Sequence, residues 1–294
     1  MGALIMQNAT LIILIVISAL LMVILHSHNK RIKINRIKKQ LKSIRLNSQL
    51  KSLLITIQKQ RGLCSRFKNG DTSLKAEIVN NLKTSETSIN ILEYQFDDFL
   101  NKDTRWMSLR NDWLNLKNNA PQLDEEESFL KHSLIIENIL YLISSIAHKG
   151  QNDLQTSIST EEINIIWENI PQTLEAMWKT RDIGSGVASA GICTQANKIK
   201  LRLLSDEIIR NFNIVSNQLN NESLNDETTK VTIQISHTID SFVEMVRNSL
   251  ISAKSPEITV EPFFKQATDA MDGISQLFDK MSSIKVHQIE RTLN

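Results

Sequence analysis

The chain opens with a long apolar run. Residues 3–25 carry no charged side chain, and apart from Ser18 they are interrupted only near their start, by Gln7, Asn8 and Thr10. At about 1.5 Å per residue, a helix of this length reaches the roughly 30 Å thickness of a bilayer core. A cleaved signal peptide carries its positive charge before the apolar run, and here the charge comes after it. The pattern therefore predicts a single transmembrane anchor over residues 1–29.

From residue 30 onward the apolar positions recur three and four apart, which is the spacing of helices with one buried face. No segment shows the sustained alternation of a strand, and Gly and Pro are scarce. The sequence predicts an all-α fold of long antiparallel helices in one bundle or two stacked bundles. The expected helices cover residues 30–67, 73–100, 105–117, 124–150, 160–169, 172–190, 195–219, 224–253 and 261–291, and residues 151–160 form the clearest linker.

Charge changes this picture at the amino-terminal end. The whole chain has a net charge of only +2, yet residues 26–51 hold nine basic residues and no acid, so the remainder is acidic. Basic residues directly after a span predict an outside amino terminus and a cytoplasmic body at the cell membrane. We expect the basic helix 30–46 to face anionic lipid headgroups. The acidic body, in a chain with only 5% aromatic residues overall, argues against nucleic-acid binding.

Composition also limits the chemistry. Two Cys residues cannot form a disulfide framework, and no Cys/His cluster has the spacing of a metal site. We find no Ser-His-Asp set, paired carboxylates or phosphate-binding Gly loop. The sequence predicts a protein that is not an enzyme and that has neither a cofactor nor a metal.

A short internal repeat points to a different kind of site. Residues 59–65 (K-x-R-x-L-x-S) match residues 179–185 (K-x-R-x-I-x-S), 120 positions later. Arg61 and Arg181 each fall within the apolar stripe of their helix. Since a buried guanidinium must have a negative partner, each arginine is expected to meet one. That partner is either a carboxylate of a neighbouring helix or a bound planar oxyanion, and the residues alone leave both open.

Small residues surround both arginines. Ser65 and Ser185 each lie one helical turn after their arginine and are candidate anion ligands. Gly62, Gly184 and Gly186 are expected to let neighbouring helices approach closely, because glycine inside a helix is otherwise destabilising.

Both segments resemble a known family. Residues 58–65 (Q-K-Q-R-G-L-C-S) resemble the Q-x-E-R-G-x-x-S signature of nitrate- and nitrite-sensing (NIT) domains, and residues 175–181 (E-A-M-W-K-T-R) resemble their E-A-x-G-x-E-R element. The resemblance implies an all-helical sensor that binds nitrate or nitrite between its helices, with Arg61 and Arg181 as ligands. Coverage runs over residues 47–253.

The chain departs from that pattern at three positions. Gln60 and Thr180 replace acids, and Trp178 replaces a glycine on the face of Arg181, where it is expected to narrow or reshape the pocket. The ligand is then nitrate, nitrite or another small anion. Arg247, in a late helix, is a candidate third anion contact.

The predicted organisation is an anchor (1–29), a basic juxtamembrane helix (30–46), a NIT-like sensor domain (47–253) and an amphipathic helix (254–294). The predicted function is a membrane-anchored, non-enzymatic anion sensor. It signals to an unidentified protein partner or through a homodimer. The alternative is a structural or adaptor bundle, tethered to the membrane, whose arginines are internal salt-bridge partners.

Overall fold

The computed structural model describes residues 2–120, 122–152, 159–221 and 226–292, with side chains for 17–120, 122–150, 159–219 and 229–292. No strand occurs among these residues, and the all-α prediction is confirmed. The α-helices are α1 (Gly2–Lys68), α2 (Lys75–Gln95), α3 (Asp97–Leu100), α4 (Thr104–Asn119), α5 (Glu125–Asn152), α6 (Thr160–Asn164), α7 (Ile170–Ala190), α8 (Gln195–Asn221), α9 (Asp226–Val246) and α10 (Val260–Arg291). Short 3₁₀ and π turns cover Thr72–Leu74, Ile165–Asn169 and Arg247–Ser252.

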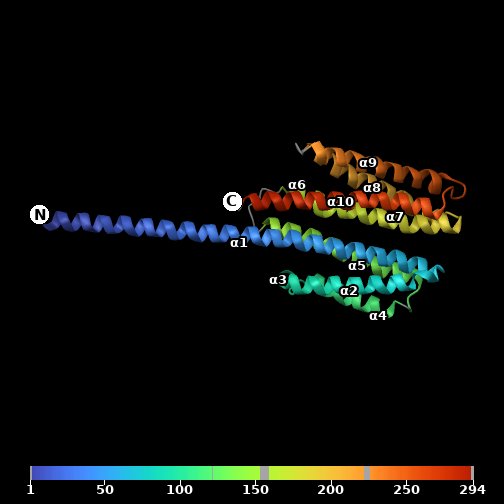
Figure 1. Cartoon of the computed structure of the whole chain (residues 1–294), viewed down its shortest axis with the longest axis horizontal. Helices are drawn as coiled ribbons and strands as arrows, with labels where there is room; N and C mark the ends of the chain where they lie inside the picture. Colours follow the sequence, from blue (N-terminus) through green and yellow to red (C-terminus); the bar gives the residue numbers. More distant parts are fainter. Residues whose placement is uncertain (1, 121, 153–158, 222–225, 293–294) are drawn as a thin grey trace.

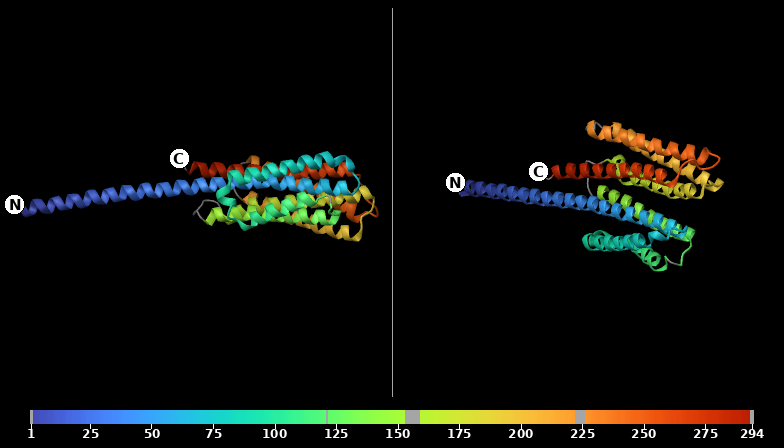
Figure 2. Two further views of the ribbon diagram at one scale, coloured as in Figure 1. Left: turned by 90° about the horizontal axis from the view of Figure 1, so that it is seen from below. Right: turned by 45° about the vertical axis from the view of Figure 1, so that its right-hand side comes forward.

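The helices form two bundles that lie side by side. Helix α1 packs against α2 and α5, and α4 packs on α5; helices α7, α8, α9 and α10 form the second group. Figures 1 and 2 show α1 and α5 facing α7 and α10 across the middle of the molecule. The antiparallel double-bundle prediction therefore holds.

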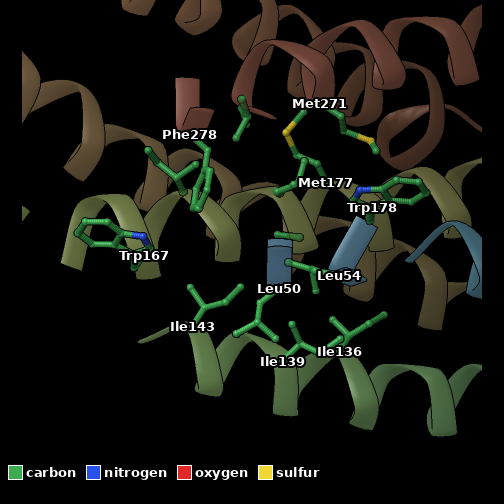
Figure 3. Packing of buried hydrophobic residues seen from close by; sticks show 14 of the residues in the cluster. Leu50, Leu54, Ile136, Ile139, Ile143, Trp167, Met177, Trp178, Met271 and Phe278 are labelled. Carbon is green, nitrogen blue, oxygen red and sulfur yellow. The ribbon is translucent and has the colours of Figure 1, made fainter. Parts of the chain in front are cut away.

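One continuous apolar core joins the two groups. Leu50 and Leu54 of α1 lie between Ile139 of α5 and Met177 of α7, and Figure 3 shows them meeting there. Leu50, Leu54, Ile139 and Met177 are each 0% exposed. Because apolar positions of α1, α5 and α7 converge on this point, the two arginine-bearing helices α1 and α7 are held against each other.

Most predicted helix ends are reproduced. Helix α1 continues without a break to Lys68, and Gly70 has the positive φ (107°) that the helix stop required. The expected helix 73–100 is interrupted at Phe96, whose φ of −126° and ψ of 30° separate α2 from α3. The side chain of Phe96 is buried in the core at this break.

The entry to the second bundle is also close to expectation. Ser159 caps α6, with the Glu162 side chain accepting a hydrogen bond in return, and Pro171 lies in the first turn of α7 as predicted. A π turn, Ile165–Asn169, connects α6 to α7 where the sequence suggested a break. Of the predicted linker 151–160, residues 153–158 lie outside the described residues.

Helix α1 extends well beyond the bundles at its amino-terminal end (Figure 1). The predicted anchor falls partly on residues 1–16, whose side chains lie outside those described, but the run Leu20–Leu25 is exposed throughout. Among the described residues, the segment Glu125–Gly150 of α5 has the length and composition of a membrane-crossing helix, and 44% of its most apolar stretch is buried in the protein. Its contacts with α1 and α4 make it a core helix of the first bundle.

Candidate functional site

Arg61 lies at the interface between the two bundles and is 1% exposed. Its guanidinium makes a two-pronged contact with Glu175 of α7, with Nη1 2.6 Å from Oε1 and Nη2 3.4 Å from Oε2. Nη1 also donates to Ser133 Oγ at 3.2 Å, and Gln58 Nε2 donates to Glu175 Oε2 at 2.8 Å. Arg61 therefore meets the first of the two alternatives, a carboxylate of a neighbouring helix.

A second carboxylate completes the surroundings of Arg61. Its Nε lies 3.3 Å from Oδ2 of Asp182, whose side chain is 6% exposed. A Cβ at Gly62 would come within 2.9 Å of Asp182 Oδ1, so a larger residue at position 62 would displace this carboxylate from its place beside α1. The close-approach prediction is confirmed at Gly62.

The carboxylates of Glu175 and Asp182 are not equally stabilised by Arg61. Burial on its own would lower the pKa of Arg61, but the charges of Glu175 and Asp182 raise it above its ordinary value. Burial raises the pKa of Asp182, although the charges of Arg61 and Arg181 oppose that change. The carboxylate of Asp182 makes a single, longer contact with a guanidinium already engaged by Glu175, so its charge is the less stabilised of the two.

Arg181 differs from Arg61 in having no carboxylate within ion-pair distance among the described side chains. It is 6% exposed, and Nη1 donates to Thr268 Oγ1 of α10 at 3.2 Å. Its Cζ lies 3.9 Å from the ring centroid of Trp178 and 4.3 Å from that of Phe264. Its Nε is buried and has no hydrogen-bond partner in the described part of the chain. Burial lowers the pKa of Arg181 to about 10, so the group stays charged at neutral pH.

Ser185, one turn after Arg181 on α7, is 7% exposed. Its Oγ is also buried and has no partner among the residues with described side chains. Next to it, a Cβ at Gly184 would overlap the Phe263 ring of α10, whereas Gly186 has nothing within 4 Å. The close-approach prediction is thus confirmed at Gly184 and wrong at Gly186, which faces outward.

The other two predicted ligands lie on exposed parts of the structure. Ser65 Oγ donates to Glu125 Oε1 at 2.7 Å. Arg247 pairs with Asp206 at 2.9 Å, and both side chains are about half exposed. Neither residue joins the buried group of Arg61, Glu175, Arg181 and Asp182 in any contact that the structure gives.

Several residues of the site were not predicted from the sequence. Glu175 stands in the resemblance motif, but its pairing with Arg61 across 114 positions has no local signal. Asp182 directly follows Arg181, and a small residue at position 62 was the only hint that it has room beside α1. Thr268 and Phe264 come from α10, outside the predicted sensor domain.

One cavity lies away from the buried arginines. It has a volume of about 250 Å³ and is formed by α2, α3 and α4 around Glu93, Trp106 and Arg110. None of the predicted anion ligands lines it. Arg181 itself is 6% exposed and is covered by Trp178 of α7 and by Phe264 and Thr268 of α10.

Comparison with known proteins gives a likeness of fold. No protein-family model matches the chain. Comparison with curated proteins likewise finds no match. Among solved structures, the NasR transcription antiterminator superposes with a TM-score of 0.68 at 13% sequence identity, covering 92% of this chain and 75% of NasR. At this identity, what the two proteins share is the all-helical fold.

Proposed function

We propose that this protein is a non-enzymatic sensor of a small oxyanion, nitrate or nitrite, which binds at Arg181. The observation that carries the proposal is a buried, charged guanidinium without a carboxylate partner among the described residues, beside an unpaired Ser185 Oγ. A buried donor of a charged guanidinium that lacks a direct partner is costly, and a bound anion would accept a hydrogen bond from the free Nε. The NIT-like motif around residues 175–181 and the fold likeness to a transcription antiterminator support a regulatory role.

The geometry around Arg181 favours a planar anion. The rings of Trp178 and Phe264 pack against the guanidinium of Arg181, and its Nη1 donates a hydrogen bond to Thr268 Oγ1. The edge of the guanidinium that carries Nε is left to bind a ligand. Such an edge matches two oxygens of a planar oxyanion. Arg61 in this proposal is a positioning residue, because Glu175 and Asp182 already use its donors.

We also propose that the protein is anchored in the cell membrane by its first helix, with the bundles in the cytoplasm. The exposed apolar run Leu20–Leu25 and the basic residues that follow it on α1 support this placement. A signal then passes to a protein partner or through a homodimer. The adaptor alternative draws its support from Arg61, which is fully engaged by internal carboxylates.

The test is calorimetric titration of the full chain in nonionic detergent with nitrate, nitrite, chloride and sulfate at constant ionic strength. We expect saturable binding of nitrate or nitrite that is lost in Arg181→Met and retained in the matched surface control Arg247→Met. A folded wild-type protein that binds none of the four anions contradicts the proposal and supports the adaptor. Equal affinity in the wild type and Arg181→Met also contradicts it.

A further inference from the structure

Asp182 supplies the second carboxylate of the buried charged group, and it lies next to both arginines. It follows Arg181 on α7, its side chain is 6% exposed, and it faces Arg61 of α1 at 3.3 Å. Glu175 already supplies Arg61 with both carboxylate oxygens. Arg61 therefore has two buried carboxylates beside it, and Asp182 is the second of them.

The charges of the buried group balance as they stand. Arg61 and Arg181 contribute two positive charges, and Glu175 and Asp182 contribute two negative ones. An anion bound at Arg181 makes this group net negative in a weakly screened environment, and each further charge on the ligand adds the same repulsion again. Removing the charge of Asp182 restores the balance for a singly charged anion.

Groups farther from Asp182 change this balance less. Lys179 lies 3.5 Å from Glu175 on the same helix and is 27% exposed. Asp272 of α10 and Arg66 of α1 act on Arg181 only through space, with opposite signs. From α5, the buried His132 is neutral at physiological pH, since burial lowers its pKa to about 4.

We propose that Asp182 determines which anions the site accepts: its charge selects singly charged over doubly charged ligands and couples their binding to uptake of a proton by its carboxyl group. The proposal rests on the proposed anion site at Arg181. The direction of the proton coupling agrees with the raised pKa of the buried Asp182 carboxyl. Wild-type affinity for nitrate is then expected to increase as the pH falls.

The decisive variant is Asp182→Asn, which keeps the shape and removes the charge. Loss of one unit of repulsion is expected to tighten nitrate binding about tenfold, and sulfate binding about a hundredfold because sulfate carries twice the charge. The pH dependence of nitrate binding should also disappear. Asp272→Asn is the matched control, because it removes an exposed carboxylate that acts on the same arginine without contact.

A second measurement needs no variant. Wild-type titrations with nitrate in two buffers of different ionisation enthalpy report the protons taken up on binding. Proton uptake in the wild type, absent in Asp182→Asn, supports the proposal. Nitrate binding without proton uptake, or an unchanged nitrate-to-sulfate ratio in a folded Asp182→Asn, overturns it while leaving the anion site intact. Absence of wild-type anion binding instead overturns the site itself.

Discussion

The two core arginines are expected to affect stability in opposite directions. The perturbations are Arg61→Met and Arg181→Met, which keep an extended side chain and remove the charge. Arg61 is paired with Glu175 and Asp182, whereas Arg181 has no carboxylate in ion-pair contact among the described side chains. The same substitution thus removes a charge in direct contact with two carboxylates in one case and a charge without such a contact in the other.

The magnitudes follow from burial and pairing. Arg61→Met leaves two buried carboxylates without their cation, a situation that costs about 3–5 kcal/mol. For Arg181, a pKa lowered to about 10 corresponds to roughly 3 kcal/mol of disfavour for the charged form in the folded protein. The lost hydrogen bond to Thr268 and the lost packing of the guanidinium on Trp178 offset part of that gain, by about 1–2 kcal/mol. The net expectation for Arg181→Met is a stabilisation of about 1–2 kcal/mol.

The assay is thermal unfolding of the full chain in nonionic detergent, in a buffer free of nitrate and nitrite, because bound anion stabilises the wild type by mass action. We expect Tm to fall by several degrees in Arg61→Met and to rise by a few degrees in Arg181→Met. With nitrate at 100 times its Kd, the wild type should gain about 2.7 kcal/mol and Arg181→Met should gain nothing. A destabilisation of Arg181→Met as large as that of Arg61→Met refutes the reasoning, since it means that Arg181 is fully paired without a ligand.

Three further outcomes are expected. Gly62→Ala places a Cβ 2.9 Å from the Asp182 carboxylate and should lower the free energy of unfolding by about 1–3 kcal/mol. Gly186→Ala has open space around it and should raise the free energy of unfolding by up to about 1 kcal/mol; both changes are measured by chemical denaturation. Arg247→Ala removes an exposed ion pair and should change stability by less than about 1 kcal/mol, with unchanged anion affinity by calorimetry. Burial lowers the pKa of His132 from 6.5 to about 4, so the unfolded chain binds its proton at a higher pH than the folded one. The free energy of unfolding should therefore be unaffected above pH 6.5 and should fall by about 3 kcal/mol between pH 6.5 and 4. His132→Gln should reduce this pH dependence.

The sequence determined the local structure of this protein. Apolar residues three and four apart placed the helices, and Gly70 and Pro171 marked a helix end and a helix start that the structure reproduces. The same periodicity placed Arg61 and Arg181 in buried stripes and showed that each needs a negative partner. These are properties of a single helix, so they depend only on residues within a few turns.

Only the tertiary structure decided which partner each arginine has. Glu175 and Asp182 lie on the same helix as Arg181, yet they pair with Arg61, 114 and 121 positions away. The register of α7 against α1 produces that result, and it depends on core packing and on the space that Gly62 leaves for a carboxylate. Two arginines with equivalent sequence surroundings thus differ in charge compensation, because pairing across a helix interface is set by how the helices pack and not by the pattern within either one.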